Sequence, residues 1–103
     1  MAKKERGLNK DKSEANSLDA LIFLRAVGNI NRYQILACLK RGGKCVCDIN
    51  TCLGLRQNLT SFHLKVLERS NLINSRKEGV RVFYDLNHSE IDKYLVALRE
   101  DLV

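Results

Sequence analysis

Residues 53–86 read LGLRQNLTSFHLKVLERSNLINSRKEGVRVFYDL, and this stretch decides the fold. Its first half has apolar residues at helical spacing and predicts a helix over about residues 57–70. The residues expected to face inward are Leu59, His63, Leu64 and Leu67. After Leu72 the period becomes that of a strand: residues 72–77 predict one strand, Glu78-Gly79 a turn, and residues 80–86 a second, alternating strand. The stretch therefore predicts a helix followed by a β-hairpin.

Further helices are predicted on both sides of this unit. Two precede it, one from a cap at Asn16 or Ser17 to Gly28 and one over residues 31–41. A short helix follows, in which Val46, Ile49 and Leu53 share a face and Gly54 ends the helix. A last helix from about Ser89 has an apolar stripe of Ile91, Tyr94, Leu95, Leu98 and Leu102. The order predicts a winged helix-turn-helix, an α+β fold that is mainly α with a β-hairpin as the wing.

The length of 103 residues suits one domain, which we expect over residues 16–103. The charged start, residues 1–15, is expected to be a flexible N-terminal arm. The first and last helices have longer leucine stripes than a three-helix core can bury, so we expect a homodimer formed through these two helices.

The charge of the chain favours a polyanionic partner. The net charge is +6 and the pI is near 9.4. Residues 54–84 hold six basic residues against two acidic ones, whereas residues 88–103 hold two basic against four acidic. Positive charge is therefore concentrated where a winged helix meets double-stranded DNA, since binding releases counterions there. The candidate DNA-binding residues are Gln57, Asn58, Ser61, Phe62 and Lys65 on the helix, and Arg76, Lys77 and Arg81 on the wing.

No apolar run is long enough to span a membrane and no signal peptide opens the chain, which predicts a cytoplasmic protein with reduced thiols. No Ser/His/Asp set and no Gly-rich phosphate loop is visible, so we do not expect an enzyme.

The stretch KCVCDI together with residues 53–86 resembles the ArsR/SmtB family of metal-responsive winged-helix repressors, over about residues 18–95. The specific parts are CVCD and the pattern S-x-H-L-x-x-L-x-x-x-x-L that starts at Ser61. The resemblance implies a homodimeric repressor that an inducer releases from operator DNA. In the arsenic-sensing branch, which is the most similar, that inducer is As(III) or Sb(III) bound by cysteine thiolates.

The chain departs from the family pattern at three places. The third cysteine of the arsenic-sensing branch would fall at Asn50, but here a cysteine stands at position 52. The cadmium- and lead-sensing branch uses cysteines of the N-terminal arm, and this arm has none. The family's zinc-type site on the last helix is reduced to His88, Glu90 and Asp101.

Cys45, Cys47 and Cys52 are the candidate metal ligands, because soft trivalent ions prefer thiolates. Cys45 and Cys47 can converge only where the helix is not yet wound, and Cys52 lies roughly 10 Å further along a regular helix. Gathering all three around one ion would therefore bend the first helix of the DNA-binding pair, and this predicts how an inducer weakens binding. Cys52 could equally be a small residue on a helix flank, and Cys38 is expected to be a buried packing residue.

Three other functions remain open at this point. The thiols could form a redox or reactive-sulfur switch on the same DNA-binding protein. The chain could also sense Cd, Pb or Zn with the same fold. Outside this class, it could be a winged-helix module that binds other proteins and has no operator.

Overall fold

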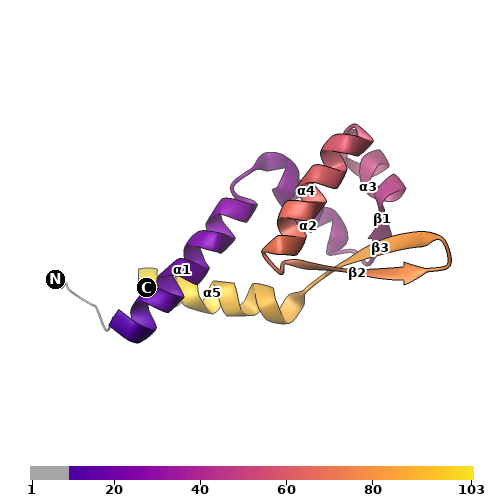
Figure 1. Ribbon diagram of the computed structural model, residues 1–103. Helices are drawn as coiled ribbons and strands as arrows, with labels where there is room; N and C mark the ends of the chain where they lie inside the picture. The colour runs from indigo at the N-terminus through magenta and orange to yellow at the C-terminus, as the bar shows by residue number, and fades with distance from the viewer. Residues whose placement is uncertain (1–9) are drawn as a thin grey trace.

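The computed structural model describes the backbone of residues 10–103 and the side chains of residues 18–103 (Figure 1). Residues 1–9 of the predicted arm lie outside the described residues. The elements are α1 (Lys10–Val27), α2 (Ile30–Leu39), β1 (Lys44–Cys45), α3 (Val46–Leu53), α4 (Gln57–Arg69), β2 (Ile73–Glu78), β3 (Arg81–Leu86) and α5 (His88–Leu102). This order confirms the α+β winged helix-turn-helix, with α3 and α4 as the helix pair and β2 and β3 as the wing.

The core lies where α2, α3 and α4 meet the base of the wing. Ile35 of α2, Ile49 of α3 and Leu67 of α4 are fully buried, as is Leu72, which precedes β2. These are apolar positions that the helical spacing places on one face, so burial of that face holds the three helices together. Gly54 ends α3 in the left-handed region, with φ of 69°, and this lets the chain turn directly into α4.

A short strand that the sequence pattern did not reveal joins α3 to the wing. Lys44 and Cys45 form β1, which pairs antiparallel with β3 through Lys44–Tyr84 and Cys45–Phe83. The sheet order is β1-β3-β2, so β3 is the central strand. The backbone just before α3 is therefore hydrogen-bonded to the wing.

Three details of the predicted elements are corrected by the structure. Helix α1 begins at Lys10 rather than beside Asn16 or Ser17, because no glycine or proline interrupts the helix-forming residues before them. Leu59 is exposed and Thr60 is buried instead; the Thr60 hydroxyl is satisfied by donating to the Arg56 carbonyl at 3.2 Å. The hairpin turn lies one residue later than predicted, so Val80 is 98% exposed at its tip.

Helices α1 and α5 pack side by side and extend away from the helix pair and the wing (Figure 1). The rings of Phe23 and Tyr94 stack between them at a centroid distance of 5.5 Å, and the Tyr94 hydroxyl donates to the Ser70 carbonyl at 2.8 Å. The outer faces of both helices expose large apolar side chains: Leu18, Leu21, Ile22, Leu24, Leu95, Val96 and Leu102.

Helix α5 is capped by Asn87, whose side chain accepts from the Glu90 amide. His88 is therefore the first residue of the helix, and its side chain is exposed. Within residues 10–103, no helix combines the length and the apolar character needed to cross a membrane.

Candidate DNA-binding surface and thiol sites

The position of α4 is fixed by an arginine that bridges three helices. Arg32 of α2 donates through Nε to the Ala26 carbonyl at the end of α1, at 2.6 Å. One of its terminal nitrogens lies 3.1 Å from Nδ1 of His63 on α4. Burial, and then the positive charge of Arg32, lower the pKa of His63 below its ordinary value. His63 is thus a satisfied, neutral structural histidine, as its place on the inner face predicted.

The opposite face of α4 is open. All five candidate DNA-binding residues of this helix are exposed: Gln57, Asn58, Ser61, Phe62 and Lys65. Phe62 is 57% exposed, and its ring makes an edge contact with His63 at 5.4 Å between centroids. Phe62 therefore does not fold back onto the scaffold, and its side chain faces outward. The face offers amide, hydroxyl, ammonium and aromatic groups, which suit contacts to base edges and phosphates.

The wing carries two kinds of basic residue. Lys77 and Arg81 are exposed, and neither forms an ion pair with another side chain among residues 18–103. Arg76 is also exposed but is held by the hairpin itself, through Asp85 at 2.7 Å and through Glu78. Its guanidinium carbon also lies 5.1 Å from the centre of the Phe83 ring. The hydrogen bond to Asp85 is the main reason that the pKa of Arg76 is raised. Arg76 therefore stabilises the hairpin, whereas Lys77 and Arg81 are not engaged by neighbouring carboxylates in the described part of the chain and can pair with a bound anion.

Cys45 and Cys47 border one open surface pocket of about 260 Å³ beside the wing, together with Val46, Arg81 and Val82. Cys45 is buried, and its thiol donates to an oxygen of Asp48 at 3.3 Å. Cys47, the second residue of α3, is exposed. Cys45 is the extended N-cap of α3 and Cys47 lies in its first turn. Two thiols at this helix start can supply two soft ligands to one ion, so the donor chemistry of this pocket fits a trivalent metalloid.

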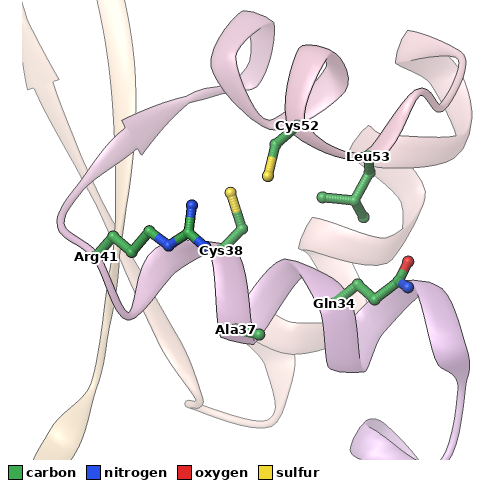
Figure 2. A pocket seen from close by; sticks show the side chains of 6 residues that line it. All are labelled: Gln34, Ala37, Cys38, Arg41, Cys52 and Leu53. Carbon is green, nitrogen blue, oxygen red and sulfur yellow. The ribbon is translucent and has the colours of Figure 1, made fainter.

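Cys52 lies at the other end of α3 and points toward Cys38 of α2 (Figure 2). The two thiols line a shared pocket with Gln34, Ala37, Arg41 and Leu53. Burial is the main reason that the pKa of Cys38 is raised to about 11, and the neighbouring Cys52 thiol, which can accept a hydrogen bond from the protonated Cys38, raises it further. Cys38 is buried, as predicted, but it is not merely a packing residue, because it faces a second thiol.

The structure thus sorts the four cysteines into two pairs at opposite ends of α3. Residues 10–103 hold no group of three or more His, Cys, Asp or Glu side chains arranged to bind one metal ion. A site that uses Cys45, Cys47 and Cys52 together would require α3 to bend, as the helical spacing predicted. The facing of Cys38 and Cys52 could not be found from sequence, because fourteen positions and a helix crossing separate them.

The chain is similar to known transcriptional regulators. A sequence family described as "Bacterial regulatory protein, arsR family" matches residues 30–75. The "Transcriptional activator HlyU" of Vibrio cholerae is 38% identical over 91 residues, 88% of this chain and 84% of the relative. Its solved structure covers 81% of this chain and 92% of its own, with a TM-score of 0.71. The "Arsenical resistance operon repressor" of Bacillus subtilis is 36% identical over 72 residues, 69% of each chain.

A further solved structure concerns the oligomeric state. It is described as a homodimeric winged helix-turn-helix DNA-binding domain from Mycobacterium bovis, a possible ArsR-family regulator. It is 26% identical to this chain, covers 93% of it and 91% of its own, and has a TM-score of 0.71.

The helix pair, the wing and these relatives define a winged helix-turn-helix transcriptional regulator, not an enzyme. Within that class, the chain belongs to the ArsR family.

Proposed function

We propose that this regulator binds operator DNA as a homodimer in the cytoplasm, and that As(III) or Sb(III) releases it from the operator. The observation that carries the DNA-binding part is the exposure of the outer face of α4 and of basic residues on the wing. The exposed candidate residues of α4 are Gln57, Asn58, Ser61, Phe62 and Lys65, and the wing adds Lys77 and Arg81. Arg76, which is paired with Asp85, supports the shape of the wing. Polar groups on a recognition helix beside free basic residues on a wing are what base and phosphate contacts require.

Selection from a random duplex library by the reduced protein tests operator binding. The selected duplex is then bound at a series of salt concentrations and compared with a scrambled duplex of equal composition. We expect preference for the selected sequence and a steep loss of affinity as salt rises. Equal binding of both duplexes, or of neither, would instead support a protein-interaction module.

The homodimer is supported by the apolar outer faces of α1 and α5. Leu18 is 61% exposed, Leu21 54% and Leu95 46%, and together with their neighbours they form a surface that a second copy could cover. We expect Leu21→Glu to yield a monomer in analytical ultracentrifugation. Ile30→Glu is the matched control, because Ile30 is 66% exposed on α2 and outside this surface. If Leu21→Glu remains dimeric, the interface lies elsewhere.

The sensing part of the proposal rests on the pocket between α3 and the wing. Cys45 and Cys47 border it together with Arg81, which is a candidate DNA-binding residue. Cys45 also pairs with Phe83 in the sheet, so a ligand that draws the two sulfurs together acts on the start of α3 and on β3 at once. A coupling of about 1–3 kcal/mol is typical of such links and would lower DNA affinity roughly 5–150-fold.

We propose a repressor because a ligand that weakens DNA binding switches genes on only where the bound protein blocks them. The relatives carry both names, activator and arsenical repressor, and the thiol pocket favours the second. Cys52 is the candidate third ligand, and α3 would have to bend to bring its thiol to the other two.

Titration of the reduced protein–DNA complex with arsenite, antimonite, cadmium, lead and zinc tests the inducer. We expect arsenite and antimonite to release the wild type, and Cys47→Ser to resist release while keeping its DNA affinity. Cys52→Ser is the matched control at the other end of α3: loss of release in this variant would identify Cys52 as the third ligand. Release by cadmium, lead or zinc alone would replace the metalloid with that ion.

A further inference from the structure

The second pair of thiols, Cys38 and Cys52, has no part in the pocket beside the wing. The two sulfurs point toward one another across the packing of α2 against α3, with Arg41 and Leu53 around them (Figure 2). Cys52 is exposed to solvent, whereas Cys38 is only 5% exposed. One thiol is therefore open to a reagent from solution, and the other is sheltered directly behind it.

We propose that Cys38 and Cys52 form a reversible disulfide when the protein meets a hydroperoxide, and that this disulfide weakens DNA binding independently of the Cys45–Cys47 pair. Formation of the disulfide depends only on the two thiols. Its regulatory effect rests on the operator binding proposed above.

The chemistry divides between an attacking thiol and a resolving thiol. The exposed Cys52, as thiolate, attacks the peroxide: an S–O bond forms, the O–O bond breaks, and the leaving alkoxide or hydroxide takes up a proton. The Cys38 sulfur then attacks the sulfenic acid of Cys52; the S–S bond forms, the S–O bond breaks, and hydroxide leaves with the Cys38 proton as water. Two thiols and one hydroperoxide thus give one disulfide, one water and one alcohol or second water, and the two electrons come from the sulfurs.

The environment of Cys38 suits the second role. Cys38 is sheltered from solvent, with only 5% of its surface exposed, so a hydroperoxide in solution reaches the exposed Cys52 first. Its position beside Cys52 gives it a high effective concentration for the resolving step.

Closure of the disulfide acts on the recognition helix. The two thiols, which point toward one another in a shared pocket, must approach to an S–S distance of about 2.05 Å, which draws the end of α3 toward α2. Only residues 54–56 separate α3 from α4, so this movement reaches the start of α4, where Gln57 and Asn58 are exposed. We expect about a tenfold loss of DNA affinity, within the usual range for coupled sites.

The experiment uses the full chain with Cys45→Ser and Cys47→Ser combined. This background is needed because trypsin leaves Cys45, Cys47 and Cys52 together on residues 45–56, whereas Cys38 lies on residues 33–40. After one equivalent of hydrogen peroxide, mass spectrometry without reductant should find these two peptides linked. Thermal melting by circular dichroism checks the fold, and Cys45→Ala replaces the serine variant if that variant does not fold.

DNA affinity is measured on the same samples with the duplex selected by the reduced protein. We expect roughly tenfold weaker binding after peroxide, recovery with dithiothreitol, and no response to peroxide when Cys38→Ser or Cys52→Ser is added. Absence of the linked peptide, a disulfide between two copies of Cys52, or a linked peptide with unchanged affinity would each overturn the proposal. If the reduced protein selects no duplex, operator binding and the regulatory part fail together, and the peptide map still decides the thiol part.

Discussion

The unequal environments of Lys77 and Arg76 on the same strand give a prediction about salt dependence. Lys77 is exposed and has no ion-pair partner among residues 18–103, whereas the guanidinium of Arg76 is already paired with Asp85 and Glu78. We therefore expect Lys77 to neutralise a DNA phosphate in each protomer, and Arg76 to contribute mainly to the shape of the wing.

The size of the effect follows from counterion release. A dimer presents two copies of Lys77, so Lys77→Gln should make the slope of log affinity against log salt shallower by about 1.8. Between about 50 and 200 mM salt, the variant should then lose roughly tenfold less affinity than the wild type. Fluorescence anisotropy with the selected duplex at several salt concentrations measures both slopes.

Two variants serve as controls for this measurement. Lys93→Gln makes the same chemical change on α5, where Lys93 pairs with Glu90 at 3.3 Å, and should leave the slope unchanged. Arg76→Gln should change the slope by clearly less than Lys77→Gln. The reasoning fails if Lys77→Gln keeps the wild-type slope, or if the Lys93 variant alters it equally.

Three further predictions concern single side chains. Tyr94→Phe removes the hydrogen bond to the Ser70 carbonyl, so the free energy of unfolding measured in urea should fall by about 1 kcal/mol. Tyr33→Phe is the control, because Tyr33 is 62% exposed. An equal loss of stability in this control would contradict the prediction. The lowered pKa of His63 means that the unfolded state takes up the proton first, so stability should fall as the pH drops below about 6.5 and level off below the folded pKa. His63→Gln should flatten that part of the pH profile, and parallel profiles would show that other groups cause it. Phe62→Ala should weaken DNA binding about fivefold, as loss of a contact worth roughly 1 kcal/mol does, and leave the free energy of unfolding within about 0.5 kcal/mol; a large loss of stability would mean that the ring packs on the scaffold.

Features that depend on local pattern were predictable from the sequence. The inward positions Leu64 and Leu67, the stop at Gly54 and the change from helical to strand period all follow from spacing and glycine chemistry, and the structure confirms them. The inward position predicted for Leu59 was wrong, because Thr60 is buried in its place. Spacing alone does not show that the threonine hydroxyl can donate to a carbonyl of its own helix and so be buried.

Features that depend on tertiary contacts were not predictable in this way. Two residues are too few to show a strand period, so β1 emerges only from its pairing with β3. The pairing of Cys38 with Cys52 and the bridge from Arg32 to His63 depend on how α2 crosses α3 and α4. Helical spacing places the five candidate residues of α4 opposite its inward face, and the structure exposes them, whereas the ion pairs of Arg76 with Asp85 and Glu78 could not be predicted from one sequence.

The bridge made by Arg32 has a consequence for the spacing of operator half-sites. Its guanidinium ties the end of α1, a helix of the proposed dimer surface, to α4, the proposed DNA-binding helix. In a two-fold assembly that pairs the α1 helices, this bridge holds α4 at a fixed position relative to the dimer surface of its own subunit. The distance between the two copies of α4 then depends on the bridge in each subunit. Shortening or loosening this one side chain would change which gap between half-sites the protein accepts, without altering any atom that touches a base.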